Sequence, residues 1–172
     1  MVNHDSFTEY VLDLEEILVS QFREVQQVIE LTLTERETLL KNGDDLMPVV
    51  EEKEALLDRL GVIEDNRRRV VQKLSLECGL VSPETSIGEL LPYLDSPIAQ
   101  RVSRLAEGIS TLAVQARELN DYNQALACTR LDWLRAAQVF LVGVVQPEAG
   151  YRSPLAMRPV VETANWGMEY RA

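Results

Sequence analysis

Several residue types that most catalytic sites need are scarce in this sequence. Its 172 residues include one histidine, His4, and two cysteines, Cys78 and Cys128. His4 lies near the start of the sequence, where residues are usually poorly ordered. A Ser-His-Asp or Cys-His mechanism therefore lacks a positioned base. Two cysteines give neither a disulfide framework nor a zinc signature, and no phosphate-binding glycine motif or HExxH motif occurs. A carboxylate metal site in a helical bundle needs Glu-x-x-His pairs, which one histidine does not supply. The sequence therefore predicts a non-enzyme with no catalytic residue, no metal site and no cofactor.

Positive charge and long apolar runs are also in short supply. There are 17 Lys and Arg against 28 Asp and Glu, a net charge of -11. This balance argues against binding to nucleic acid or to an anionic membrane surface, because both need a basic footprint. The longest apolar run, residues 136–145, is interrupted by Gln138 and Gly143 and is shorter than the roughly 18 residues of a membrane helix. The first ten residues lack the basic and apolar regions of a signal peptide. We expect a soluble, cytoplasmic protein that does not insert into a membrane.

Hydrophobic residues make up 46% of the chain, and they follow helical spacing in three long segments. The first segment covers residues 6–41. Ser6 and Glu9 match a capping box at its start, and Asn42-Gly43 is a typical C-terminal signal. Its apolar face has the three-and-four spacing of one side of a helix: Phe7, Val11, Leu14, Leu18, Val25 and Val28.

The second segment opens at Asp44-Asp45 and ends near Glu77, with Gly79 as its terminator. Its seam alternates steps of three and four residues, as in a coiled coil: Leu46, Val49, Lys53, Leu56, Leu60, Ile63, Arg67, Val70 and Leu74. Lys53 and Arg67 fit the spacing but carry charge. We expect their aliphatic stems to pack in the seam while the charged groups reach partner acids.

A connector of residues 78–96 precedes the third segment, and its Ser86 and Glu89 form another capping-box match that predicts a short helix over residues 87–91. The third segment covers residues 97–145, with Ser96 as the cap and Pro97 at the first helical position. Its seam keeps the same alternation throughout: Ile98, Val102, Leu105, Ile109, Leu112, Ala116, Leu119, Asn123, Leu126, Arg130, Trp133, Ala137, Phe140 and Val144.

These segments predict an all-α fold: an antiparallel hairpin of two long helices, a longer third helix and a short connector helix. At about 1.5 Å per residue, the first two helices are roughly 50 Å long and the third roughly 70 Å. If the third helix packs along the hairpin, roughly 13 of its residues extend beyond it; the direction of packing stays open. We divide the chain into a helical bundle, residues 1–146, and a tail, residues 147–172, rich in Pro, Gly and aromatic residues. The tail either binds a partner or folds loosely back onto the bundle.

Apolar surface outside a bundle indicates association, so we place partner binding on the later part of the third helix and on the tail. The candidate residues are Asn120, Asn123, Leu126, Arg130, Trp133, Ala137, Phe140, Val144, Tyr151 and Trp166. Asn123 and Arg130 have two interpretations. Polar seam residues fix register and partner number at a cost in stability, or they mark the point where the helix leaves the intramolecular core and serves a partner.

Three stretches resemble the flagellar export chaperone FlgN family. The first runs from Leu39 through Lys41-Asn42-Gly43-Asp44-Asp45 to Leu46 and continues with Glu52-Lys53-Glu54-Ala55-Leu56-Leu57, similar to the family's helix-turn-helix with a K-E-x-L-L signature. The second comprises residues 60–64 and 67–74, which are similar to the family's L-x-x-L-E-x-x-R pattern, with Ile63 in place of a leucine. The third, Leu119-Asn120 with Asn123 and Leu126, is similar to the asparagines spaced by three in the family's last long helix. The resemblance extends over most of residues 6–145.

The resemblance implies a cytoplasmic chaperone for hook-filament junction (hook-associated) proteins. It would bind their C-terminal helical segments through an apolar surface, prevent premature aggregation and deliver them to the flagellar type III export gate. The helix-in-groove mode of recognition fits an unpaired apolar seam. The alternative is a structural or scaffolding coiled-coil protein that self-associates, because heptads specify association and not the partner. Homo-oligomerisation is therefore also open.

Overall fold

The computed structural model describes residues 4–41, 45–80 and 85–145, and the regular elements in these residues are helices. In chain order they are α1 (His4–Leu40), α2 (Leu46–Glu77), α3 (Ile87–Leu90), the 3-10 helix η1 (Leu91–Tyr93) and α4 (Ser96–Val145). This arrangement confirms the predicted all-α fold with two long helices, a longer last helix and a short connector helix. The tail, residues 147–172, lies outside the described residues.

The chain divides into two compact units, Met1–Arg130 and Leu131–Ala172. The division falls inside α4, so α4 contributes residues to both units. The predicted boundary between a bundle and a tail after residue 146 stays a prediction.

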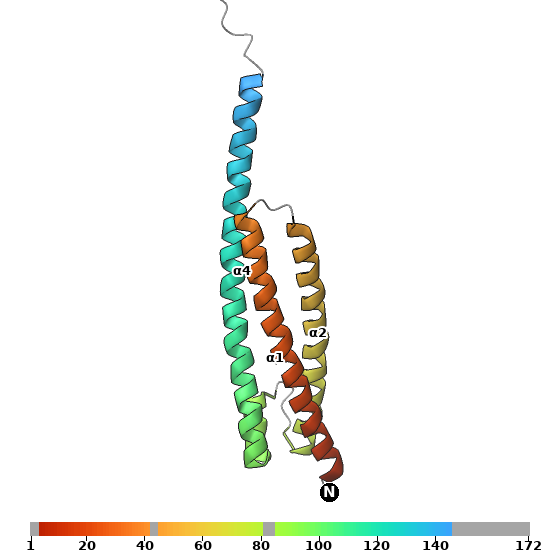
Figure 1. Cartoon of the computed structure of the whole chain (residues 1–172). Helices are drawn as coiled ribbons and strands as arrows, with labels where there is room; N and C mark the ends of the chain where they lie inside the picture. Colours follow the sequence, from red (N-terminus) through yellow and green to blue (C-terminus); the bar gives the residue numbers. More distant parts are fainter. Residues whose placement is uncertain (1–3, 42–44, 81–84, 146–172) are drawn as a thin grey trace, which may run out of the picture. The chain divides into compact units, whose positions relative to one another are not determined.

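In the first unit, α1 and α2 run antiparallel (Figure 1). Gln21 of α1 donates a hydrogen bond to Glu64 of α2 over 3.2 Å. Later in α1, Glu35 accepts from Lys53, which comes earlier in α2. Residue numbers thus rise in one helix as they fall in the other, as the short connection after α1 predicts.

α4 runs parallel to α1 within the first unit, a direction that the sequence left open. Near the start of both helices, Arg101 of α4 bonds Glu15 of α1, with 2.7 Å between Nε and Oε1. Further along both helices, the side-chain amide of Asn123 donates to the carbonyl of Thr32 over 2.7 Å. The connector from α2 through α3 therefore keeps the chain at the end of the bundle where α2 ends and α1 begins (Figure 1).

The main apolar core lies where the start of α1, the end of α2, α3 and the start of α4 meet. Its buried members come from all four helices: Val11, Leu14, Leu18, Val70, Val71, Leu74, Leu90 and Val102. Most of them occupy predicted seam positions, so the heptad spacing selected the inward faces correctly. Burying such side chains is the dominant favourable term in folding, and it fixes this end of the bundle.

The start of α1 differs from the sequence prediction. The helix begins at His4, two residues before the predicted capping residue. Ser6 therefore lies in the first helical turn and is not the N-cap, so the predicted capping box does not mark this terminus. The first backbone hydrogen bond decides where a helix begins, and that bond is not encoded by a four-residue pattern alone.

The predicted cap of α4 is wrong by one residue: α4 begins at Ser96, and the amide of Ala99 donates to the carbonyl of Asp95 over 2.8 Å, so Asp95 and not Ser96 precedes the helix. The predicted end signal Asn42-Gly43 lies outside the described residues.

Two other local end signals are confirmed. After α2, the amide of Gly79 donates to the carbonyl of Leu76 and the amide of Leu80 to that of Ser75, over 3.1 Å and 2.8 Å, the two bonds of a Schellman motif. Gly79 has φ +73°, a left-handed conformation that favours glycine. Before α3, the Ser86 side chain accepts from the backbone of Glu89 while the Glu89 side chain accepts from the backbone of Ser86, which completes the capping box.

Gly79→Ala should lower the free energy of unfolding by about 1 kcal/mol, because a Cβ disfavours the left-handed conformation. Gly61→Ala is the matched control. Gly61 lies inside α2 with open space around its Cα, so alanine should stabilise the helix there by about 0.5–1 kcal/mol. Urea denaturation of both variants checks the pair. If both substitutions changed the free energy of unfolding by the same amount in the same direction, Gly79 would not have the left-handed conformation that ends α2.

Candidate partner-binding surface

The solvent exposure of the α4 seam changes at the end of the first unit. From Ile98 to Arg130, every predicted seam residue is buried or half-buried. In the second unit, Trp133 and Phe140 each have 69% of their surface exposed, whereas the small Ala137 is half-buried. The same apolar spacing thus serves the core in the first unit and lies open to solvent in the second.

The exposed apolar residues of the second unit extend beyond that seam. They are large, lie on α4, and are each more than half exposed: Leu131, Trp133, Leu134, Val139, Phe140, Leu141 and Val142. We call this stretch, residues 131–142, the apolar end of α4. The side chain of Val144 lies outside the described part of the structure, as do Tyr151 and Trp166. Its exposure makes the apolar end of α4 the candidate surface for partner binding.

Five members of the apolar end were not among the predicted site residues. Leu131, Leu134, Val139, Leu141 and Val142 fall outside the heptad seam, because that template follows one face of the helix. The signal that identifies most of them is the apolar run of residues 136–145, which we used only to exclude a membrane span.

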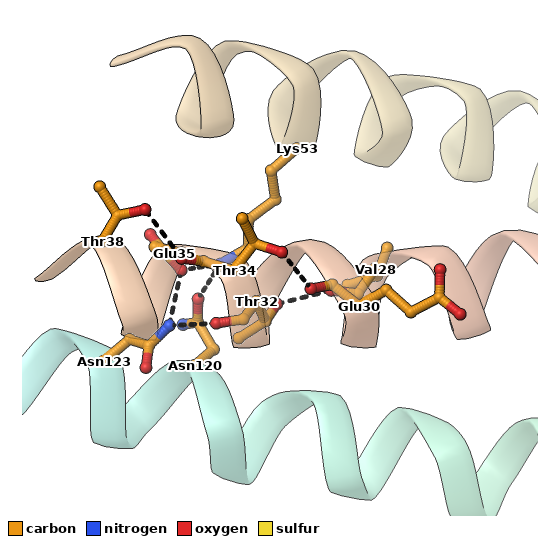
Figure 2. A network of polar contacts seen from close by, with 9 residues as sticks. All are labelled: Val28, Glu30, Thr32, Thr34, Glu35, Thr38, Lys53, Asn120 and Asn123. Carbon is orange, nitrogen blue, oxygen red and sulfur yellow. Dashed lines mark hydrogen bonds and ion pairs between the residues drawn. The ribbon is translucent and has the colours of Figure 1, made fainter. Parts of the chain in front are cut away.

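A second feature, within the first unit, is a layer of polar side chains between α1, α2 and α4. We call it the polar layer and define it as Thr32, Glu35, Lys53, Asn120 and Asn123. Lys53 is 8% exposed; its Nζ donates to Glu35 Oε2 over 2.7 Å and to Asn120 Oδ1 over 2.9 Å. Asn123 Nδ2 donates to the same Glu35 oxygen over 2.8 Å. Figure 2 shows Lys53 reaching from α2, and both asparagines from α4, toward Glu35 on α1. The expectation that Lys53 packs its stem and finds a partner acid is confirmed.

The structure therefore divides the predicted site residues into two groups. Asn123 is buried, at 3% exposure, and Asn120 is exposed but bonded to Lys53. Leu126 is half-buried, and the guanidinium of Arg130 donates to the carbonyl of Leu39. These four residues lie within the first unit, and three of them bond α1 or α2. Trp133 and Phe140 belong to the exposed apolar end. Partner binding by any of these residues stays a prediction.

The polar layer is incompletely satisfied. Among the described residues, Asn123 Oδ1 is buried and accepts no hydrogen bond, which costs on the order of 1–3 kcal/mol. An apolar residue of similar size would avoid that cost. Asn123 is thus bonded into the intramolecular core at a cost in stability, the circumstance in which polar seam residues fix register. The register hypothesis itself stays a prediction: it expects Asn123→Leu to alter the oligomeric state in solution, and an unchanged state with weaker partner binding would contradict it.

A second group of polar side chains surrounds Glu64 on α2. Its carboxylate accepts from Nε and Nη2 of Arg67, both over 2.7 Å, from Arg68 over 3.0 Å and from Gln21 of α1 over 3.2 Å. Chiefly because of the Arg67 hydrogen bonds, the pKa of Glu64 is lowered to about 2 from its ordinary value near 4.5. The same pair raises the pKa of Arg67. Arg67 thus finds a partner acid, as its seam position led us to expect.

Glu64→Gln should lower the free energy of unfolding by about 1 kcal/mol at pH 7, because water screens this partly exposed carboxylate and limits its effect. The folded-state pKa is depressed, so the stabilisation is fully present above pH 4.5 and is lost as pH falls through about 2. Urea titrations of both proteins between pH 7 and pH 2.5 measure the difference. Glu54→Gln, at an exposed acid of the same helix, is the control. If the difference in the free energy of unfolding between the two proteins stayed constant from pH 7 to pH 2.5, the lowered pKa of Glu64 would be contradicted.

Charge is distributed very unequally along the chain. Residues 1–130 carry 13 Lys and Arg against 24 Asp and Glu, a net charge of -11, whereas residues 131–172 carry 4 of each, a net charge of zero. The apolar end of α4 has one charged pair, Asp132 and Arg135, whose atoms Oδ1 and Nη1 are 3.5 Å apart. A largely apolar helix segment without net charge thus follows a strongly acidic first unit in the sequence.

Neither a metal site nor a membrane span emerges from the described residues. In residues 4–41, 45–80 and 85–145, no three His, Cys, Asp or Glu residues are placed to hold a metal ion. None of the helices described there is long and apolar enough to cross a membrane.

Comparison with known proteins and protein families identifies the family of this chain. No curated protein and no solved structure matches the chain. A family model described as FlgN protein matches residues 11–158. This range contains all three stretches on which the sequence resemblance rests, as well as the polar layer and the apolar end of α4. The chain therefore belongs to the FlgN family, a family of flagellar export chaperones and not of enzymes.

Proposed function

We propose that this protein binds hook-associated proteins through the apolar end of α4, prevents their premature aggregation and presents them to the flagellar type III export gate from the cytoplasm. The observation that carries the proposal is the row of large apolar side chains exposed on residues 131–142. Family membership supplies the general role of a flagellar export chaperone. The client and the binding surface are our proposal.

The chemistry of this surface suits a helical client. Trp133 and Phe140 are seven residues apart and lie on one side of α4, where the apolar face of an amphipathic helix can pack against them. Aromatic side chains of this kind contribute most of the binding energy at protein interfaces. We expect the C-terminal helical segments of hook-associated proteins to supply the matching face, because their apolar sides are uncovered until assembly.

The acidic first unit has a separate role in this proposal. A net charge of -11 on residues 1–130 keeps the chaperone soluble while an apolar surface is exposed, and it steers association toward basic partner surfaces. Client association should accordingly slow as the ionic strength rises.

The proposal is tested by mixing the purified full-length chain with a purified hook-associated protein. We expect a 1:1 complex in size-exclusion chromatography and suppressed light scattering by the client at equimolar chaperone. A client variant lacking its C-terminal helical segment is the control and should neither bind nor be protected. A chain that self-associates and leaves client aggregation unchanged would instead support the alternative of a self-associating scaffold.

A further inference from the structure

The last part of the apolar end of α4 is apolar on every side. Four consecutive residues, Val139, Phe140, Leu141 and Val142, are exposed by 73%, 69%, 59% and 51%. Successive side chains on an α-helix point about 100° apart, so four in a row cover the whole circumference. A helix with this pattern is normally surrounded by other elements.

The preceding two turns of the same helix differ. Asp132, Arg135 and Gln138 are all exposed, and at about 100° per residue they fall within roughly 120° of the helix circumference. Trp133 and Phe140 lie on the opposite side. One partner helix on the Trp133 and Phe140 side would therefore leave two exposed apolar residues uncovered, Leu131 and Val142. Leu131 points about 160° away from Trp133, and Val142 points about 160° away from Phe140.

We propose that the client encloses residues 139–142 from two sides, with one helical segment on the Trp133 and Phe140 side and a second apolar segment on the Val142 side. This inference rests on the proposed function and adds to it: the client contributes at least two segments, and the end of α4 inserts between them.

Charge favours a client over a second copy of this chain. Each copy carries a net charge of -11 on residues 1–130 and none on residues 131–172. Two copies that associate bring two strongly acidic units into one particle, and like charges oppose that association. An apolar client with flanking basic residues carries no such cost, and its basic residues are attracted to the acidic first unit.

Arginine substitutions on the two sides test the inference, with a purified full-length hook-associated protein as the probe. Phe140→Arg and Val142→Arg should each weaken binding by at least about 30-fold, because each places a charge in a desolvated contact. Gln138→Arg is the matched control. Gln138 lies four residues before Val142 on the same side of the helix but is already polar, so we expect a change of less than about threefold. Free Val142→Arg protein should keep the melting temperature of the unsubstituted chain.

The possible outcomes separate this inference from the proposed function. If the unsubstituted chain does not bind the hook-associated protein, the proposed function fails and the inference with it. If that chain binds and only Phe140→Arg loses binding, the client lies on one side, and the inference alone is overturned. A lower melting temperature of free Val142→Arg would show that the chain itself covers this side. If Val142→Arg dissociates a dimer of this chain and leaves client binding unchanged, a second copy covers the Val142 side of α4. Either result overturns the inference.

Discussion

Replacing Trp133 and Phe140 together by alanine should weaken client binding by at least about 100-fold while leaving the fold intact. Each aromatic side chain is 69% exposed in the free protein, so its removal costs the free protein little packing. In a complex, each becomes a buried aromatic anchor, for which alanine substitution typically costs about 2 kcal/mol or more. Titration calorimetry with a purified hook-associated protein measures the affinity, and circular dichroism measures the melting temperature.

The control for this prediction removes two other exposed apolar side chains, which lie in the first unit. Leu57 and Leu76 of α2 are 49% and 69% exposed. Leu57→Ala with Leu76→Ala should leave the affinity within about threefold of the unsubstituted protein, because no contact with the client is lost. Equal losses of affinity in the two double variants would show that the apolar end of α4 has no special part in binding.

The largest effect on stability should come from the polar layer. Lys53→Met should lower the free energy of unfolding by about 3 kcal/mol, because it leaves Glu35 with its negative charge in a nearly buried site. The two side chains are only 10% and 16% exposed and their charged atoms are 2.7 Å apart. Adding Glu35→Gln should recover a large part of the loss, since glutamine removes the charge yet still accepts a hydrogen bond from Asn123. Urea denaturation at pH 7 measures all three proteins.

Lys41→Met is the matched control for Lys53→Met. Lys41 and Glu37 also form an ion pair, but over 3.8 Å and with side chains 78% and 72% exposed. An exposed pair of this kind contributes less than about 0.5 kcal/mol. If Lys53→Met and Lys41→Met have the same effect, the polar layer is not a buried network in solution.

Much of the fold was predictable because it depends on local signals and periodicity. The end of α2 at Gly79 and the capping box of Ser86 and Glu89 each involve only a few neighbouring residues, and the structure contains both. The seams were predictable because the three-and-four spacing selects one face of a helix whatever its partner is. The start of α1 was misplaced by two residues, since a capping pattern does not determine where the first backbone hydrogen bond forms.

The features that sequence did not determine depend on contacts between distant segments. The connector after α2 has enough residues to return α4 in either direction, and only contacts such as that between Arg101 and Glu15 establish that α4 runs parallel to α1. The spacing placed Lys53 and Asn123 in seams, but it did not show that both bond the same oxygen of Glu35. A heptad template also follows a single face, so it omitted Val139, Leu141 and Val142 from the candidate surface.

Hydrogen exchange of the full-length chain, measured by mass spectrometry with and without a purified hook-associated protein, tests the central claim most directly. Client binding should slow the exchange of α4 amides in residues 131–145, while exchange in α1 and α2 stays unchanged. Slower exchange in α1 and α2 with no change in residues 131–145 would contradict it, because the client would then bind the first unit and not the apolar end of α4.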